Sequence, residues 1–364
     1  MSTLAPTSPF SLTQYGRATS RDDDPASDSG AFEPAPTEGP LRDRFGRIAN
    51  DLRLSITDRC NFRCSYCLSP DAQFLPSESR LSTQEIIQLG RTFARLGVER
   101  LRITGGEPTL HPDLCEIISE LSPLYGDVSM TTNGSRLTEA TAKAWKAAGL
   151  KRITISIDSV DPARFRAVSR SNLDPAVVID GIRAAIGAGL GPVKVNAVLL
   201  VGVNDEDAPA LAELARALAI EIRFIEFMPL DADGSWNTTR VVSSAKTIER
   251  ISDVFPLIAE GRDRPDRTAV RFRFADGSAG SVGTIAPVSD PFCGECSRIR
   301  VTPDGFLRPC LLANSEWPIR HLLKGRGSDE AIEAAIREAI WNKDRGGALR
   351  MGPMEGRTMS AIGG

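Results

Sequence analysis

Residues 51–67 read DLRLSITDRCNFRCSYC. The alternation of apolar and polar side chains predicts a β-strand over residues 52–57, and Cys60, Cys64 and Cys67 follow its carboxyl end in one loop. An iron–sulfur cluster that only transfers electrons takes four cysteine ligands. Three thiolates at this CxxxCxxC spacing therefore predict a four-iron cluster with one iron left open for a small molecule. A zinc site, or three unrelated thiols, is the alternative, although a structural zinc ion takes four ligands.

The fold class follows from the strands and helices around this stretch. Short runs rich in β-branched residues alternate with helical patterns that end at Gly97, Gly149 and Gly189, where a glycine can terminate a helix. Six such alternations predict an α/β fold of parallel βα units, a partial (β/α)6 TIM-like barrel over residues 46–240. Its site is expected at the carboxyl ends of the strands. The expected strands are 52–57, 100–104, 128–132, 153–157, 193–199 and 223–227, and the expected helices are 83–96, 138–148, 175–188 and 208–219.

The two ends of the chain differ in sequence pattern from the predicted barrel. Residues 1–45 are rich in Ser, Pro, Asp and Ala and poor in large apolar side chains, which predicts a disordered extension. Residues 241–364 form the expected smaller C-terminal region, where Asp276-Gly277 predicts a hairpin turn. The expected elements there are strands 268–275, 280–285 and 298–302 and a helix over 329–341, before a tail that ends in Gly363-Gly364.

Composition narrows the class of protein. The net charge of −3 at pH 7 lacks the basic excess usual for nucleic-acid binding. No apolar run reaches the ~18 residues of a membrane span, and the first residues lack a signal-peptide pattern, so a cytoplasmic protein is expected. Cytosolic thiols stay reduced, which favours metal ligation over disulfides for the seven cysteines. Cys115 stands alone and is interpreted as a buried helix thiol.

A second group of cysteines lies near the carboxyl end. Cys293, Cys296 and Cys310 again supply three thiols without an obvious fourth, which predicts a second open cluster, this time for the substrate. Arg298 and Arg300 alternate on the following strand and so face the same side. Two guanidinium groups suit a phosphate-bearing ligand. A zinc ribbon is the alternative, because CxxC is a common zinc fragment.

Several other residues at strand ends fit a ligand. Glycines in the stretch GGEP at 105–108 permit close approach to the backbone, and Glu107 can hold an ammonium group. Ser156 can bond a carboxylate, and Met228 can pack on an adenine ring; a plain strand serine and a core methionine are the alternatives. Cations at barrel positions are costly unless an anion meets them, and a triphosphate would do so. These cations include Arg53, Arg100, Arg102, Lys194 and Arg223.

Together these features closely resemble the GTP 3′,8-cyclase family (molybdenum cofactor biosynthesis protein A) of the radical S-adenosylmethionine superfamily. The matching segments are 51–67, RLRITGGEP at 100–108, TTNG at 131–134, ISID at 155–158, RFIEFMPL at 223–230, FCGECSRIRVT at 292–302 and MSAIGG at 359–364. They span nearly everything from about residue 45 to residue 364. One departure is Leu68-Ser69-Pro70, where the family commonly has Met-Pro after the third cysteine.

The resemblance implies a lyase that cyclises GTP to (8S)-3′,8-cyclo-7,8-dihydroguanosine 5′-triphosphate, the first step of molybdenum cofactor biosynthesis. It implies two 4Fe–4S clusters, one on Cys60, Cys64 and Cys67 with S-adenosylmethionine, and one on Cys293, Cys296 and Cys310 with the substrate. It assigns S-adenosylmethionine contacts to Tyr66, Gly106, Ser156 and Met228, GTP contacts to Arg53, Arg102, Thr132, Lys194, Arg223, Arg298 and Arg300, and catalytic roles to Arg298, Arg300, Gly363 and Gly364.

The resemblance also implies a reductant such as flavodoxin or ferredoxin, transfer of the product to cyclic pyranopterin monophosphate synthase, and a monomer or homodimer without nucleic-acid or membrane partners. Two other functions compete with it. Another radical enzyme with an auxiliary cluster, such as a peptide modifier, would not need the Arg298/Arg300 pair or the glycine tail. A zinc-bearing RNA-binding protein would use His321 or a carboxylate as its fourth ligand and would show a basic surface.

Overall fold

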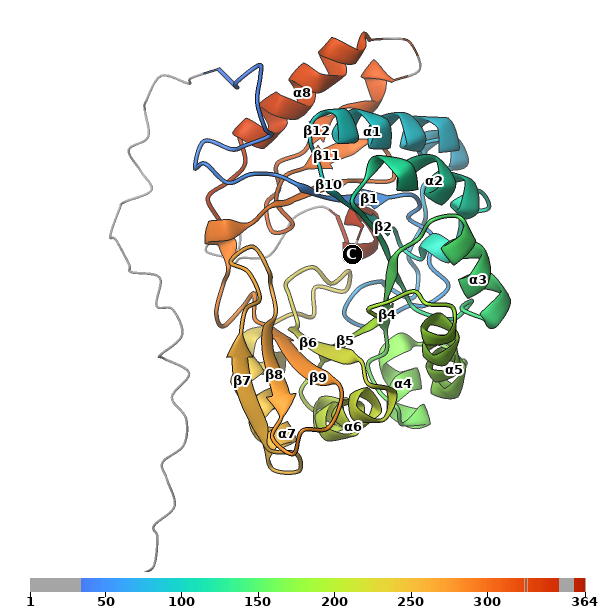
Figure 1. The fold of residues 1–364 in the computed structure, drawn as a ribbon, viewed down its shortest axis with the longest axis vertical. Helices are drawn as coiled ribbons and strands as arrows, with labels where there is room; N and C mark the ends of the chain where they lie inside the picture. The colour runs from blue at the N-terminus through green and yellow to red at the C-terminus, as the bar shows by residue number, and fades with distance from the viewer. Residues whose placement is uncertain (1–33, 324, 326, 347–356, 364) are drawn as a thin grey trace, which may run out of the picture. The chain divides into compact units, whose positions relative to one another are not determined.

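The computed structural model of the chain describes residues 34–323, 325, 327–346 and 357–363. Residues 35–364 form one compact unit, so the predicted extension over 1–45 lies largely outside the described residues. One 12-stranded sheet runs through the unit in the order β12-β11-β10-β1-β2-β3-β4-β5-β6-β9-β8-β7. The sheet curves strongly (Figure 1), and within the described ranges it stays open, with β12 and β7 at its edges. The predicted α/β partial barrel is confirmed.

The six predicted βα strands form the middle of this sheet, and each pairs in parallel with the next. Successive side chains along each strand point alternately to the apolar core and to the concave side of the sheet. In the first strand, Leu52 and Leu54 are fully buried in the apolar core, whereas Arg53 between them faces the hollow side of the sheet. The strands are β1 (Asp51–Ser55), β2 (Arg100–Thr104), β3 (Asp127–Thr132), β4 (Arg152–Ser156), β5 (Lys194–Leu199) and β6 (Glu221–Glu226).

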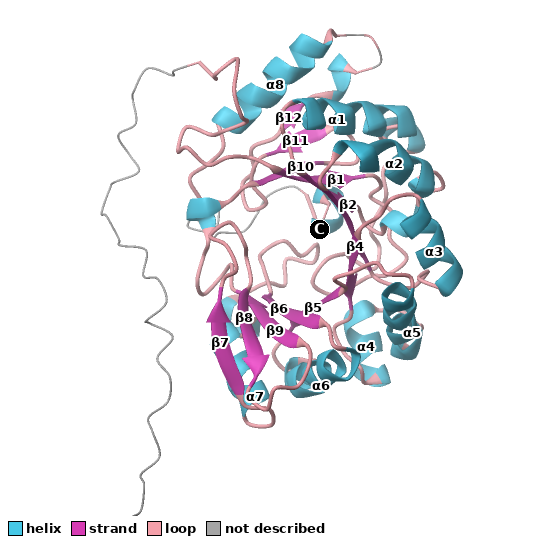
Figure 2. Ribbon diagram, viewed as in Figure 1, coloured by secondary structure: helices cyan, strands magenta, loops and turns pink. Residues whose placement is uncertain are grey.

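Helices cover the outer face of the curved sheet (Figure 2). Gly97, Gly149 and Gly189 have positive φ angles just after three of them, as the glycine positions predicted, whereas α6 ends on Ala219 with a φ of 53°. Cys115 lies in a helix but is exposed, so its interpretation as a buried thiol is wrong. The helices are α1 (Thr83–Arg95), α2 (Leu114–Leu121), α3 (Glu139–Ala147), α4 (Pro162–Ser169), α5 (Pro175–Gly187) and α6 (Ala208–Leu218), of which α2 and α4 were not predicted.

The C-terminal region extends both edges of the barrel sheet. Strand β9 (Ser281–Ile285) pairs in parallel with β6, and β10 (Arg298–Val301) pairs in parallel with β1. The predicted hairpin is confirmed, because β8 (Val270–Phe274) and β9 are antiparallel. The remaining elements are α7 (Ser244–Ser252), β7 (Leu257–Gly261), β11 (Phe306–Arg308), β12 (Trp317–Pro318), α8 (Asp329–Trp341) and α9 (Met359–Ile362). The expected domain boundary near residue 240 stays a prediction.

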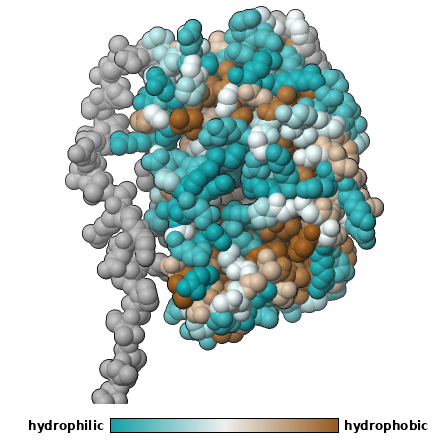
Figure 3. Space-filling view, viewed as in Figure 1, coloured by the Kyte–Doolittle hydropathy of each residue, from teal (hydrophilic) through white to brown (hydrophobic). Residues whose placement is uncertain are grey.

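Short 3-10 turns connect these elements. They are η2 (Ser77–Ser79), η3 (Pro108–Leu110), η4 (Ser122–Leu124), η5 (Asp205–Asp207), η6 (Thr238–Arg240), η7 (Cys293–Glu295) and η8 (Arg320–Leu322). Hydrophilic side chains predominate on the face shown in Figure 3, and apolar ones gather in separate patches. Within the part of the chain that the structure describes, no helix is both long enough and apolar enough to cross a membrane.

Candidate active site

A cavity of about 310 Å3 lies inside the curve of the sheet, and both cysteine groups line it. Most of the predicted site residues share this cavity. They are Arg53, Cys60, Cys64, Tyr66, Cys67, Arg102, Gly106, Thr132, Ser156, Arg223, Met228, Cys293, Cys296, Arg298, Arg300 and Cys310. Residues that lie far apart in the sequence are therefore brought to one space, and two sets of three thiols face it.

The first cysteine loop follows β1 and is tied to the end of α4. The backbone N–H of Ser65 donates to the carbonyl of Val168 at 2.9 Å, and that of Cys67 turns back to the carbonyl of Cys64 at 2.8 Å. Burial raises the pKa of Cys60 to about 11 and that of Cys67 to about 12. These thiols stay protonated near neutral pH until a metal displaces their protons.

The glycines after β2 make room for the cysteine loop. A Cβ on Gly106 would lie 2.5 Å from the carbonyl oxygen of Arg59 and closer still to that of Asp58, and a Cβ on Gly105 would lie 2.6 Å from the carbonyl oxygen of Thr57. The N–H of Gly106 donates to Thr57 at 2.7 Å. Their missing side chains make room for the backbone of the loop that carries the thiols, and the ligand contact of Gly106 stays a prediction.

Glu107 anchors the loop after β3 to the loop after β2. Its carboxylate accepts hydrogen bonds from the Thr132 hydroxyl at 2.7 Å, from the backbone N–H of Asn133 at 2.6 Å and from the Thr109 hydroxyl at 2.7 Å. Burial raises the pKa of Glu107. The hydroxyl of Thr132, predicted to contact GTP, is thus already engaged with Glu107 and also accepts from the N–H of Gly134 at 3.1 Å.

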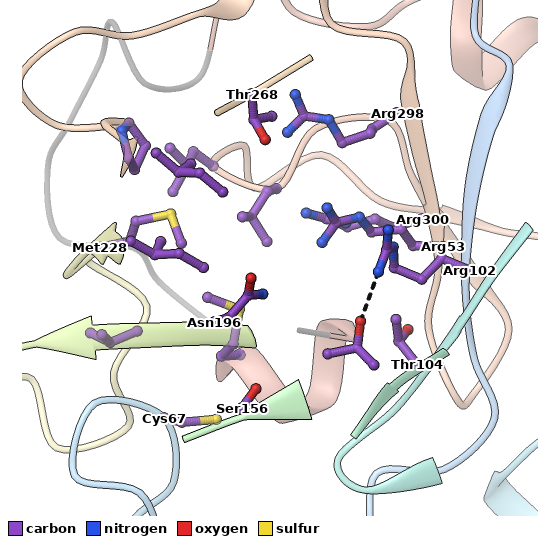
Figure 4. A pocket seen from close by; sticks show the side chains of 18 of the residues that line it. Arg53, Cys67, Arg102, Thr104, Ser156, Asn196, Met228, Thr268, Arg298 and Arg300 are labelled. Carbon is purple, nitrogen blue, oxygen red and sulfur yellow. Dashed lines mark hydrogen bonds between the residues drawn. The ribbon is translucent and has the colours of Figure 1, made fainter. Parts of the chain in front are cut away.

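Polar groups line the cavity beside the first cysteine loop. The Tyr66 hydroxyl donates to Asp158 at 2.9 Å, and burial raises the pKa of Asp158 to about 6. Ser156 at the end of β4 is the register partner of Asn196 on β5, and the side-chain oxygen of Asn196 is buried without a hydrogen-bond partner among the described residues. In Figure 4 these two side chains lie near Cys67 and Met228, on the side of the cavity opposite the arginines.

The second cysteine group sits at the other side of the cavity. Cys293 begins η7, and Cys296 directly follows it. Burial opposes ionisation of Cys296, but the positive charges of Arg298 and Lys343 lower its pKa to about 6. His321, the candidate fourth ligand of a zinc site, lines a different cavity with Glu85 and Arg320. Within the described ranges, no three His, Cys, Asp or Glu side chains are close enough to bind a single metal ion.

Three arginines form a row across the sheet between the two cysteine groups. Arg53 on β1 is the register partner of Arg300 on β10 and of Arg102 on β2, and Figure 4 shows them together with Arg298. Burial, followed by the charge of Arg300, lowers the pKa of Arg53 to about 9. The Nη1 atom of Arg300 is buried with no hydrogen-bond partner in the described part of the chain. Such crowded guanidinium groups make a strong site for an anion.

Two predicted residues lie away from the cavity lining. Lys194 begins β5, and its amine is 2.8 Å from the carboxylate of Glu221, which also pairs with Arg223. Burial lowers the pKa of Lys194 to about 8. Gly363 has a φ of 79°, and a Cβ there would lie 2.8 Å from Ser55 and Thr104, so the tail packs against β1 and β2. Gly364 lies outside the described residues.

Several cavity residues were not singled out from the sequence. Glu226 ends β6, and its carboxylate accepts from the backbone N–H groups of Ser244, Val288 and Ser289 at 2.8, 3.1 and 2.9 Å. Further examples are Arg47, Asp158, Asn196, Thr268 and Lys343. Asp158 and Asn196 could have been found from their place at the ends of β4 and β5. Arg47 and Lys343 stand in segments without a strand or helix pattern, so no local signal marks them.

Comparisons with known families agree with this geometry. The family model for the radical SAM superfamily matches residues 54–215, and the model described as Molybdenum Cofactor Synthesis C matches residues 220–349. Among solved structures, Streptococcus suis SuiB bound to its precursor peptide SuiA has a TM-score of 0.61 at 12% identity, over 81% of this chain and 66% of that one. At this identity the likeness concerns the fold alone.

Curated relatives are much closer in sequence. The GTP 3′,8-cyclase of Mycolicibacterium smegmatis is 42% identical over 92% of this chain and 95% of its own length. The enzyme of the same name from Paenarthrobacter nicotinovorans is 40% identical over 92% of this chain and 99% of its own length. Sequence identity at this level over nearly complete chains shows a shared family and not only a shared fold. The chain therefore belongs to the GTP 3′,8-cyclase family of the radical S-adenosylmethionine superfamily.

Proposed function

We propose that this protein is itself a GTP 3′,8-cyclase, a lyase that converts GTP to (8S)-3′,8-cyclo-7,8-dihydroguanosine 5′-triphosphate as the first step of molybdenum cofactor biosynthesis. The observation that carries the proposal is a single cavity lined by two sets of three cysteines, with the row Arg300–Arg53–Arg102 between them. One thiol set suits generation of a radical, and the other set and the arginines suit a phosphate-bearing substrate.

As a member of the radical SAM superfamily, the protein binds a 4Fe–4S cluster and S-adenosylmethionine. Its ligands in our proposal are Cys60, Cys64 and Cys67. The donor set fits, because three soft thiol ligands lie on one loop and line the cavity. The proposed contacts of S-adenosylmethionine are Tyr66, Gly106, Ser156 and Met228, all of which line the same side.

We propose that Cys293, Cys296 and Cys310 hold a second 4Fe–4S cluster. Two observations support it. The low pKa of Cys296 keeps its sulfur in the thiolate form that binds iron, and the cavity position of all three thiols leaves room for a substrate beside them. His321, the candidate fourth ligand of a zinc ribbon, lines another cavity, which disfavours that alternative.

GTP is proposed to lie between the two cysteine groups. Arg53, Arg102, Arg298 and Arg300 would hold the triphosphate, because they line one cavity and clustered guanidinium groups are stabilised by an anion. Arg223 and Thr132 line the same cavity. Lys194 remains a proposed GTP contact, although reaching the substrate would require it to leave Glu221.

When bound on Cys60, Cys64 and Cys67, the first cluster would supply, together with S-adenosylmethionine, the radical chemistry that removes the C3′ hydrogen of GTP. Closure of the C3′–C8 bond would then take up one electron, from the proposed reductant, and one proton. The chain's own residues place the ribose and exclude water. We propose that Arg298 and Arg300 act on the substrate directly. Catalytic roles are also proposed for Gly363, which packs against Ser55 and Thr104, and for Gly364, which lies outside the described residues.

The remaining partners are proposed from the family. A flavodoxin or ferredoxin would reduce the first cluster, and cyclic pyranopterin monophosphate synthase would take the product. We propose a monomer or homodimer that works in the cytoplasm, without a membrane or nucleic-acid partner.

Anaerobic purification followed by turnover tests the function. We expect brown protein with about eight irons per chain, as two four-iron clusters require, and conversion of GTP to the cyclic product with S-adenosylmethionine and dithionite. Colourless protein that contains zinc, or brown protein that forms 5′-deoxyadenosine but leaves GTP unchanged, would overturn the proposal.

A further inference from the structure

Two buried cations from opposite ends of the chain meet at the second cysteine loop. Lys343 follows α8, and its side chain reaches back so that the residue is only 3% exposed. Its Nζ atom donates to the carbonyl of Cys296 at 2.8 Å and to that of Arg298 at 3.0 Å, and it lies 3.6 Å from the sulfur of Cys296. The ammonium group of Lys343 therefore contacts both Cys296 and Arg298, at the beginning of β10.

Arg47 approaches the same loop from the amino-terminal side of β1. Its Nη1 atom donates to the carbonyl of Cys293 at 2.8 Å and to that of Arg345 at 2.6 Å, and Nη2 donates to the carbonyl of Asp344 at 2.6 Å. The Nε atom pairs with Asp43 at 2.6 Å. Arg47 thus joins three segments: the chain before β1, the second cysteine loop and the chain after α8.

The two cations differ in how their charge is balanced. The charge of Arg47 is neutralised by Asp43. Lys343 has no carboxylate within ion-pair distance in the described part of the chain, and its hydrogen-bond partners are two carbonyls and a sulfur. A buried ammonium group is costly unless an opposite charge is near. The anion that this geometry offers Lys343 is the thiolate of Cys296.

We infer that Arg47 and Lys343 form a cationic clamp on the second cysteine loop, in which Arg47 fixes the position of Cys293 and Lys343 raises the reduction potential of the cluster that this loop holds. The inference rests on the second cluster of the proposed function. Reduction adds one negative charge to a cluster, and a fixed cation beside a ligand sulfur stabilises that charge. Both clamp residues are positioning residues for the cluster.

The test compares reduction potentials in anaerobic, fully loaded protein. Redox titration followed by electron paramagnetic resonance separates the two clusters, because S-adenosylmethionine changes the signal of the first and GTP that of the second. We expect Lys343→Met to lower the potential of the second cluster and to leave that of the first unchanged. Lys343→Arg, which keeps the charge, should restore the second potential. Lys146→Met is the matched control, since Lys146 also donates to a carbonyl, that of Gly189 at 2.7 Å, but lies exposed on α3.

Arg47→Met tests the other half of the clamp. We expect it to lose iron from the second cluster while the first cluster and its S-adenosylmethionine-dependent signal remain, which also shows that the variant is folded. Loss of the second cluster in Lys343→Met but not in Lys343→Arg would equally support the clamp. Unchanged potential and iron content in both Met variants would overturn it. A wild-type protein with only one cluster would instead overturn the second cluster of the proposed function, so the two failures are distinguishable.

Discussion

Arg53 on β1 and Arg300 on β10 are register partners on adjacent parallel strands, although nearly the whole barrel separates them in the sequence. Arg102 lies on the other side of Arg53. Burial lowers the pKa of all three guanidinium groups, with the charge of Arg300 acting on Arg53, that of Arg53 on Arg102 and that of Arg298 on Arg300. The pKa falls to about 9 for Arg53 and Arg102 and to about 10 for Arg300. The row is an unfavourable arrangement for the empty protein and a favourable one for a triphosphate.

Removing one member of the row should weaken GTP binding. A charge-assisted hydrogen bond contributes about 1.5–3 kcal/mol, so Arg300→Met should raise the Kd for GTP by about 10–100-fold in anaerobic equilibrium binding. Arg300→Lys should lose less, because it keeps the charge. The control is Arg91→Met, whose arginine is exposed on α1 and pairs with Glu120 at 2.5 Å. An unchanged Kd in Arg300→Met would contradict the placement of the triphosphate.

Gly106 should be essential for the first cluster because of its contacts with the cysteine loop. A Cβ at this position would press on the carbonyls of Asp58 and Arg59, and overpacking of this kind costs about 1–3 kcal/mol. We expect Gly106→Ala to lose the iron of the first cluster, measured as iron per chain and as loss of the S-adenosylmethionine-dependent signal. Gly187→Ala on α5, where a new Cβ meets open space, should keep full iron. Equal iron in the two variants would contradict the role of Gly106.

The features of the fold and site that depend on residues close together in the chain could be predicted from the sequence. The alternation in β1 and the spacing of Cys60, Cys64 and Cys67 are both encoded within residues 51–67, and the six βα units repeat a pattern of short range. The C-terminal strands are different. Their own sequence predicts strands, but it does not state that β10 will pair with β1 and β9 with β6, because strand pairing over such separations depends on the whole sheet.

The sequence also does not decide which charged residues line the cavity. Lys194 and Arg53 are both cations on barrel strands, yet Lys194 starts its strand and pairs with Glu221, whereas Arg53 lines the cavity. The pairing of Lys194 with Glu221 on the neighbouring strand accompanies this difference, and the sequence does not show which strands will be neighbours. Lys343 is the opposite case. It reaches the second cysteine loop only because α8 returns the chain to β10.

The two cysteine groups should differ in their pH dependence after cluster removal. The pKa of Cys296 is lowered to about 6 and that of Cys60 is raised to about 11, so at pH 7 Cys296 is mainly a thiolate and Cys60 a thiol. Iodoacetamide reacts with thiolates. Its rate with Cys296, followed by mass spectrometry, should reach half its maximum near pH 6, and Cys60 should stay unreactive until much higher pH.

The same alkylation measurement tests the effect of the Lys343 charge on the pKa of Cys296. In Lys343→Met the half-maximal pH of Cys296 alkylation should rise, because a positive charge that stabilises the thiolate is gone. Equal profiles for Cys296 and Cys60 in the wild type, or an unshifted profile in the variant, would contradict the electrostatic difference between the two sites.

Glu226 should fix the position of the chain segment that precedes the second cysteine group. Its buried carboxylate accepts from the backbone N–H groups of Val288 and Ser289, a few residues before Cys293. Glu226→Gln loses the charge and part of this acceptor capacity, so we expect a loss of about 1–3 kcal/mol in stability and reduced iron in the second cluster. Glu139→Gln, at an exposed pair with Lys143, is the control. Full iron and unchanged thermal stability in Glu226→Gln would contradict the anchoring role.

The central claim is that a radical formed at the first cysteine group acts on GTP held at the second. Anaerobic turnover of GTP deuterated at C3′, with S-adenosylmethionine and dithionite, tests it most directly by mass spectrometry of the 5′-deoxyadenosine produced. We predict that the 5′-deoxyadenosine gains one deuterium as the cyclic product appears, and that Arg300→Met sharply reduces both. Formation of the cyclic product together with 5′-deoxyadenosine that carries no deuterium would contradict the account.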